Sequence, residues 1–217
     1  APFIYSLESE YYTSWIPIFF AQYEGTKSVE AFMEGKDPDG EVSEYIYTYD
    51  GQVEALKVLQ TLLDKKNGYQ HEKSSAIDFT SMQGQFIRGA ALFSINGSWL
   101  ENEAANFSSA KLDMIKTPVI SSIVQKLSFC PTDGNGKKIK ADSFTAEQKQ
   151  VADAKLAEII KYVDATDAGE TATKPEGVTD EDIAKVTEAR HYSYMAGGTD
   201  HQAYIPSYAN NKENAKN

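Results

Sequence analysis

The residues that could carry out chemistry in this sequence are three histidines, one cysteine and 32 acidic side chains. His71, His191 and His201 are far apart and belong to no HExxH or paired-cysteine pattern, so their spacing favours no metal site. Cys130 stands before a proline, and a nucleophilic cysteine needs a base and an orienting partner that the sequence does not identify. Many carboxylate pairs could be chosen as glycosidase machinery, but the sequence does not give their separation.

Two short segments come close to functional motifs without matching them. Segment 96–100, NGSWL, differs from a G-x-S-x-G nucleophile elbow at both outer positions. Segment 133–138, DGNGKK, begins like a calcium loop, but two lysines follow where ligands are needed, which favours a solvated turn. The glycine motifs that cradle phosphates do not occur. We therefore expect a protein that is not an enzyme and that uses neither a cofactor nor a metal.

The most informative feature of the composition is its high content of aromatic residues, with 13 Tyr, 10 Phe and 2 Trp. Tyrosine in such numbers often supplies contact surface, because its ring is apolar and its tip is polar. Trp99 follows the short apolar run Ala90–Ile95 and the segment Asn96-Gly97-Ser98. A tryptophan just past a strand end belongs either to a corner of the core or to a binding cleft, and both alternatives stay open at this point.

Composition excludes some classes of partner and leaves the compartment open. The net charge of −11 repels phosphate backbones and anionic lipid surfaces, so we expect no nucleic-acid partner. One cysteine forms no internal disulfide, which fits the cytosol and an exported protein equally well. No apolar run approaches the roughly 18 residues that a membrane span needs.

The elements that would position these residues alternate between helices and strands. Asp50 is a candidate cap for a helix that Asn67-Gly68 ends, and another helix should start near Thr80 or Ser81. The apolar face expected on the first consists of Val53, Leu56, Leu59, Leu62 and Leu63. Before it, residues 45–49 predict a short strand or an extended lead into the helix. Ala90–Ile95 should be a buried strand and Lys111–Ile115 another, which ends before Pro118.

The later part of the chain predicts two helices with capping boxes. Thr145 with Gln148 opens a helix that extends to residue 163, and Thr179 with Asp182 opens the next. The alternation in the first half, followed by these helices, predicts an α/β fold with a helix-rich insertion over residues 126–190.

Four segments, in the right order, resemble one family. They are SEYYTSW at 9–15, FIRGAALFSINGSW at 86–99, KLDMIKTPVI at 111–120 and AYIPSYANNKENAK at 203–216. They are similar to the extracellular solute-binding proteins of bacterial sugar ABC importers, the family of the maltose-binding type. The resemblance covers nearly the whole chain, although residues 126–190 match only loosely.

This resemblance implies a fold and a setting. The fold would be one lobe of a type II periplasmic-binding protein, a mixed sheet flanked by helices, with residues 1–217 forming a single α/β lobe. The family has two lobes, so the chain would be a fragment that covers mainly the second lobe and lacks the N-terminal one. The implied partners are a sugar or oligosaccharide, ABC permease subunits and that missing lobe. The implied location is extracellular or periplasmic, with a lipoprotein anchor outside this chain.

The resemblance also implies a binding site in the cleft between the lobes. A sugar needs flat aromatic platforms and polar tips around them. The residues predicted to contact it are Trp99, Tyr11, Tyr12, Trp15, Asn96, Glu101 and Arg190. Alternatives remain for most of them: a core position for Trp99 and Trp15, a strand-end or helix-cap role for Asn96 and Glu101, and a surface or capping role for Arg190. The competing functions are a carbohydrate-active hydrolase domain and a non-catalytic surface or adhesive domain.

Overall fold

Helices make up most of the computed structural model, which describes residues 1–97, 99–105 and 112–192. The α-helices are α1 (Trp15–Glu24), α2 (Thr26–Met33), α3 (Asp50–Leu63), α4 (Phe79–Ile87), α5 (Leu100–Ala104), α6 (Ala146–Asp167) and α7 (Asp180–His191). The 3₁₀ helices are η1 (Glu10–Thr13), η2 (Glu44–Thr48), η3 (Lys65–Asn67), η4 (Ser121–Lys126) and η5 (Ala141–Ser143), and the strands are β1 (Phe3–Ile4) and β2 (Phe93–Ser94).

Both predicted capping boxes are confirmed. The Thr145 hydroxyl accepts a hydrogen bond from the Gln148 backbone N–H at 3.2 Å, and the Gln148 side chain accepts one from the Thr145 N–H at 2.9 Å. Thr179 and Asp182 exchange the equivalent pair at 3.1 and 3.0 Å. These bonds satisfy N–H groups that have no partner inside the helix, and so fix where α6 and α7 begin.

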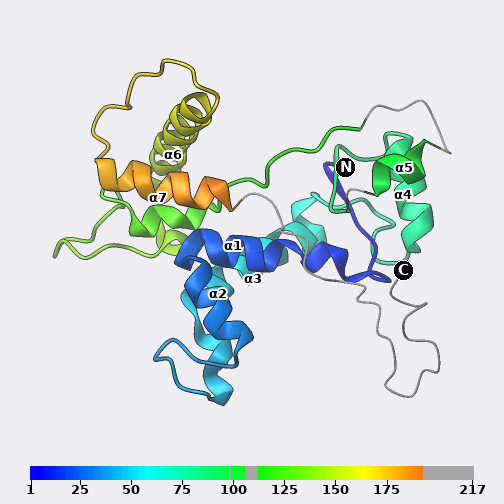
Figure 1. Cartoon of the computed structure of the whole chain (residues 1–217), viewed down its shortest axis with the longest axis horizontal. Coiled ribbons are helices and arrows are strands. Elements are labelled where there is room, and N and C mark those ends of the chain that lie inside the picture. Colours follow the sequence, from blue (N-terminus) through cyan, green and yellow to red (C-terminus); the bar gives the residue numbers. More distant parts are fainter. Residues whose placement is uncertain (98, 106–111, 193–217) are drawn as a thin grey trace, which may run out of the picture.

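One large core joins α6 and α7 to helices from the first part of the chain (Figure 1). Its buried residues are Phe19, Tyr23, Ala55, Ile120, Ile123, Val124, Leu127, Cys130, Ala152, Leu156, Ile159, Val163, Val178, Val186 and Ala189. They come from α1, α3, η4, α6, α7 and the segments between them. The helices predicted as an insertion therefore share their apolar interior with α1 and α3.

The sheet within the described residues is small and parallel. β1 pairs with β2, with Phe3 opposite Phe93 and Ile4 opposite Ser94. The coarse prediction of helices combined with a sheet is confirmed. The predicted strand at 90–95 is present only at residues 93–94, and it is not buried, since Leu92 and Phe93 are 75% and 46% exposed.

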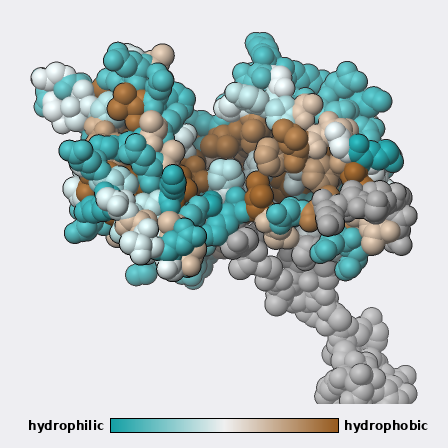
Figure 2. Space-filling model, turned by 90° about the horizontal axis from the view of Figure 1, so that it is seen from above, coloured by the Kyte–Doolittle hydropathy of each residue, from teal (hydrophilic) through white to brown (hydrophobic). Residues whose placement is uncertain are grey.

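The predicted strand Lys111–Ile115 is wrong for residues 112–115, and Lys111 itself lies outside the described residues. A strand needs a neighbour for its backbone groups, and among the described residues this segment has none. Residues 112–120 lead towards η4 without regular secondary structure, in the upper half of Figure 1. Met114 and Ile115 are 63% and 57% exposed, and hydrophobic surface gathers in the middle of the face seen in Figure 2.

Three further details differ from the sequence-based expectations. Residues 45–49, expected to be extended, lie mostly in η2. Tyr49 occupies the cap position of α3 and Asp50 its first turn, and α4 is capped by Asp78, whose carboxylate accepts from the Ser81 N–H at 2.8 Å. The predicted apolar face of α3 is partly exposed at Val53 and Leu56.

The orientation of α3 has a local steric cause. Gly51, Gln52 and Ala55 form its buried side. An ideal Cβ at Gly51 would lie 2.8 Å from Cδ2 of Phe20. The absence of a side chain there lets α1 approach that side of α3 closely.

No helix in the described part of the chain is long and apolar enough to cross a membrane.

Candidate ligand-binding surface

Trp99 lies at the surface, directly over a glycine. Its side chain is 39% exposed, and it immediately precedes α5. A Cβ built on Gly97 would lie 2.0 Å from Cζ3 and 2.1 Å from Cη2 of the indole. Any side chain at position 97 would therefore displace the ring. Glycine is needed at position 97 for this close approach and not for a left-handed backbone. Ser98 lies outside the described residues.

The Tyr11 ring contacts the indole of Trp99, and the Phe79 ring contacts Tyr11 in turn. The centroid of Tyr11, in η1, lies 5.3 Å from that of Trp99 with the planes at 55°, and 5.2 Å from that of Phe79 at 45°. These spacings are in the favourable range for aromatic pairs. We name Trp99, Tyr11 and Phe79 the aromatic triad. It joins segments near residues 11, 79 and 99, which only the tertiary fold brings together.

Phe79 is the member of the triad that the sequence analysis missed. It is the first residue of α4, and its N–H donates to the Glu8 carboxylate at 2.7 Å. It lies three residues before the buried Met82, on the same helical face. The spacing between Phe79 and Met82 is the feature of the sequence that could have indicated that Phe79 packs on this side of α4.

Tyr12 and Trp15 belong to a different set of rings. Tyr12 lies 5.5 Å from Tyr5, Tyr5 is stacked at 5.5 Å on Phe3, and Phe3 is stacked at 5.5 Å on Trp15. Trp15 also packs against the large core. The structure thus separates two residues that neighbour each other in η1: Tyr11 contacts Trp99, whereas Tyr12 contacts the side chains around β1.

Asn96 and Glu101 flank Trp99 in the chain but differ in exposure. Asn96 Oδ1 accepts from the Gly97 N–H at 2.9 Å, and its Nδ2 is enclosed without a hydrogen-bond partner in the described part of the chain. Glu101 is exposed in the first turn of α5, where a negative charge is favourable. Glu101 is thus exposed to solvent, whereas Asn96 is half-buried.

Arg190 lies in another part of the structure. Its Nε and Nη2 donate to the Asp164 carboxylate at 2.8 and 2.9 Å, and its Nη1 donates to the Thr117 carbonyl at 3.3 Å. The hydrogen bond from Arg190 keeps the pKa of Asp164 below its ordinary value. The guanidinium thus connects α7 to α6 and to the connection before η4, and the aromatic contacts of Trp99, Tyr11 and Tyr12 do not include it.

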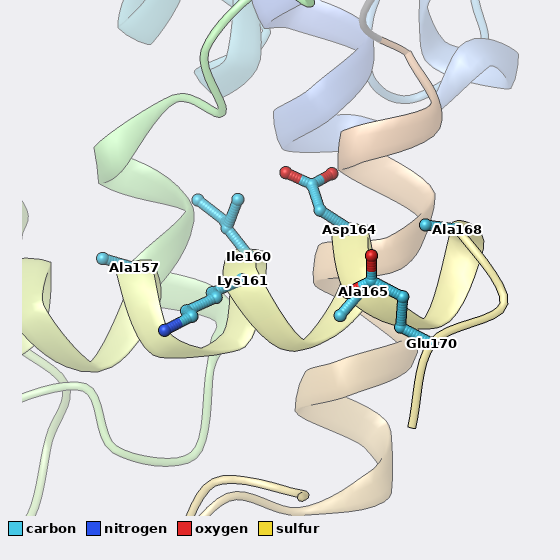
Figure 3. Close-up of a pocket in the computed structure, with 7 residues that line it drawn as sticks. All are labelled: Ala157, Ile160, Lys161, Asp164, Ala165, Ala168 and Glu170. Atoms are coloured by element: carbon cyan, nitrogen blue, oxygen red, sulfur yellow. The ribbon is translucent and has the colours of Figure 1, made fainter. Parts of the chain in front are cut away.

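A shallow hollow of about 550 Å³ lies along the outer side of α6 (Figure 3). The described residues that line it are Ala157, Ile160, Lys161, Asp164, Ala165, Ala168 and Glu170. They come from α6 and the turn after it, and none is a predicted contact residue. Of its two carboxylates, that of Asp164 is already paired with Arg190.

Groups that could do chemistry are enclosed or dispersed. Cys130 is buried, and burial raises the pKa of its thiol, which disfavours the reactive thiolate. Within residues 1–97, 99–105 and 112–192, no group of three His, Cys, Asp or Glu side chains could hold a metal ion.

Comparisons with known proteins leave the chain unassigned: no family model, no curated protein and no solved structure matches it. The arrangement itself offers a partly exposed indole in contact with a tyrosine ring. Such a surface can contact the apolar face of a small solute while polar groups bond its rim.

Proposed function

We propose that this chain binds a sugar or oligosaccharide outside the cell for uptake by an ABC importer, and that it does no chemistry. The observation that carries the proposal is the aromatic triad, in which Trp99 lies on Gly97 against Tyr11 and leaves 39% of its surface exposed. A pyranose presents flat C–H surfaces, and an exposed ring fixed by its neighbours is suited to contact them. Glu101, exposed in the first turn of α5, is the nearest acidic residue along the chain.

The resemblance of the four segments supports the family: extracellular solute-binding proteins, with this chain as one lobe of the type II periplasmic fold. Three of those segments fall wholly or mainly within the described residues, and the fourth, 203–216, lies outside them. In this proposal the ligand is clamped between this lobe and a second one. The proposed partners are the other lobe and the permease subunits. The proposed location is the outer face of the membrane, where a lipoprotein anchor would hold the protein.

Clamping predicts that this chain alone binds sugar too weakly to measure. A full affinity near ~1 μM is about −8.2 kcal/mol, and half of that is about −4.1 kcal/mol, or roughly millimolar. The cost of immobilising the ligand is not halved, so the single lobe should be weaker still. Micromolar binding of a sugar by this chain alone would contradict the clamp.

The decisive test compares Trp99→Ala with Trp15→Phe in the longer, two-lobed protein. Calorimetry with a panel of oligosaccharides should show binding by the parent and by Trp15→Phe, and at least ~10-fold weaker binding by Trp99→Ala, a loss of about 1.4 kcal/mol. Unchanged affinity in Trp99→Ala would remove the triad from the site. Release of shorter sugars during the titration would instead indicate a hydrolase domain, and neither binding nor turnover would favour a surface or adhesive domain.

A further inference from the structure

A second polar cavity lies away from the aromatic triad, where the end of α1 meets η4 and α7. Its volume is about 190 Å³, the share of roughly six waters in the liquid. The described residues that line it are Ala21, Gln22, Tyr23, Glu24, Gly25, Ile123, Lys126, Lys185 and Glu188. It is not lined by any residue that was predicted to contact a sugar.

Two opposite charges line this cavity without pairing. Glu24 Oε2 is enclosed and has no hydrogen-bond partner in the described part of the chain. The Lys126 ammonium lies 4.4 Å from the centre of the Tyr23 ring, and no carboxylate within the described ranges forms an ion pair with it. Burial lowers the pKa of Lys126, in agreement with an ammonium that has lost much of its water. The negative charges of Glu24 and Asp50 act on Lys126 from a distance and oppose part of this lowering. Neither Glu24 Oε2 nor the Lys126 ammonium makes a direct bond to the other, so both groups favour a ligand that bonds to them.

The remaining charged groups of the lining already have partners. Lys185 pairs with Glu181 at 2.7 Å, and Glu188 accepts a hydrogen bond from the Tyr192 hydroxyl at 2.8 Å. Gly25 ends α1 with a φ of 89°, a conformation that suits glycine. The C-terminal end of α1 carries the negative end of the helix dipole, and Glu24 adds a negative charge there. Together they favour a cation on that side of the cavity. Lys126 favours an anion on the other.

From this geometry we propose that the cavity binds a small zwitterion of the α-amino-acid type, with its ammonium on Glu24 and its carboxylate on Lys126. Ala21 and Ile123 supply apolar wall, which suits a small aliphatic side chain. A neutral polyol could hydrogen-bond to both groups but would bring no opposite charge to either. The proposal does not depend on sugar binding at the triad.

The test measures binding of L-alanine, L-valine and L-leucine to this chain by calorimetry and by the rise in its thermal midpoint. At least one of the three should bind. L-alaninamide lacks the carboxylate, N-acetyl-L-alanine lacks the ammonium, and each should bind at least ~10-fold more weakly than its parent amino acid, or not detectably.

Substitutions of the two charged cavity residues test whether the amino acid binds in this cavity. Glu24→Gln and Lys126→Met should each weaken it at least ~10-fold, whereas Lys149→Met, which removes an exposed lysine paired with Asp153 on α6, should not change it. Far-UV circular dichroism checks the fold of each variant, and the two modified ligands test the same charges if Lys126→Met does not fold. Absence of binding for all three amino acids, or binding that is equal in Glu24→Gln, would overturn the proposal.

Discussion

The two parts of the molecule bury their apolar residues differently. Around α1, α3, η4, α6 and α7, which we call the helical part, the described residues form one cluster of 15 buried side chains. Around β1, α4, β2 and α5, which we call the aromatic part, the described residues form three clusters of three buried side chains each. Figure 1 shows the helical part on the left and the aromatic part on the right.

This difference in burial suggests that the helical part supplies most of the folding stability and that the aromatic part supplies surface for binding. Burial in a continuous core yields most of the free energy of folding, because it removes the most apolar surface from water. Small clusters leave rings and aliphatic side chains at the surface, among them Trp99 and Phe93. Exposed apolar surface is what a ligand or a further segment of protein can cover. Substitutions should therefore act on stability in the helical part and on binding in the aromatic part.

The largest effect is expected at the centre of the helical part. Ile159 of α6 has no exposed surface, and Ile159→Ala should lower the free energy of unfolding by about 2–5 kcal/mol. Val151→Ala is the matched control on the same helix, since Val151 is 63% exposed and its truncation should cost under ~0.5 kcal/mol. Urea denaturation followed by circular dichroism measures both. Equal losses in the two variants would mean that α6 is not held by this core.

A buried carboxylate should make the helical part sensitive to acid. Burial alone would raise the pKa of Asp182, but hydrogen bonds from Ser128 and Thr179 outweigh it and bring the pKa to about 2. The unfolded value is near 3.8, so the stabilisation, about 2 kcal/mol, is complete above that pH and is lost as pH falls towards 2.

Asp182→Asn tests this linkage. The variant should be about 2 kcal/mol less stable than the parent at neutral pH, and the difference should shrink between pH 4 and pH 2. Denaturation curves at several pH values measure the difference. A gap that stays constant down to pH 2 would contradict the low pKa.

Trp99→Ala should cost less stability than truncation of a core tryptophan does. The variant loses the contact with Tyr11, and we expect a loss of about 1.5 kcal/mol, against about 3–5 kcal/mol for a fully buried tryptophan. Gly97→Ala provides a second probe, because the added methyl must displace the indole. The fluorescence of Trp99 should change in that variant when measured in a Trp15→Phe background. A loss above about 3 kcal/mol in Trp99→Ala would assign Trp99 to the core.

The smallest effect is expected for the ion pair between α6 and α7. Arg190→Met should cost between about 0.5 and 1 kcal/mol, because the Asp164 carboxylate is 37% exposed and water screens the pair. In the proposed two-lobed binding protein, Arg190→Met should leave sugar binding unchanged, since the Arg190 guanidinium bonds to Asp164 of α6. A large loss of affinity with normal stability would instead restore Arg190 as a contact residue.

Features that depend on neighbours in the chain could be predicted from the sequence. The capping boxes at Thr145 and Thr179 are confirmed because each bond joins residues only three apart. The buried face of α6 follows from helical spacing for the same reason: Ala152, Leu156, Ile159 and Val163 all lie on one side. The sequence resemblance named both Trp99 and Tyr11, and the structure places their rings in contact; their role in binding stays a prediction.

Features that depend on distant partners were decided only by the tertiary structure. An apolar segment such as residues 112–115 has the composition of a strand, but a strand forms only where another offers its backbone groups. Phe79 contacts Tyr11, whereas Tyr12 of η1 and Trp15 of α1 contact the rings around β1, because tertiary packing decides which element each ring meets. The sequence by itself thus determined the capped helices and the supply of aromatic rings. Which rings remain at the surface was set by long-range burial, whose free energy depends on contacts that no local spacing encodes.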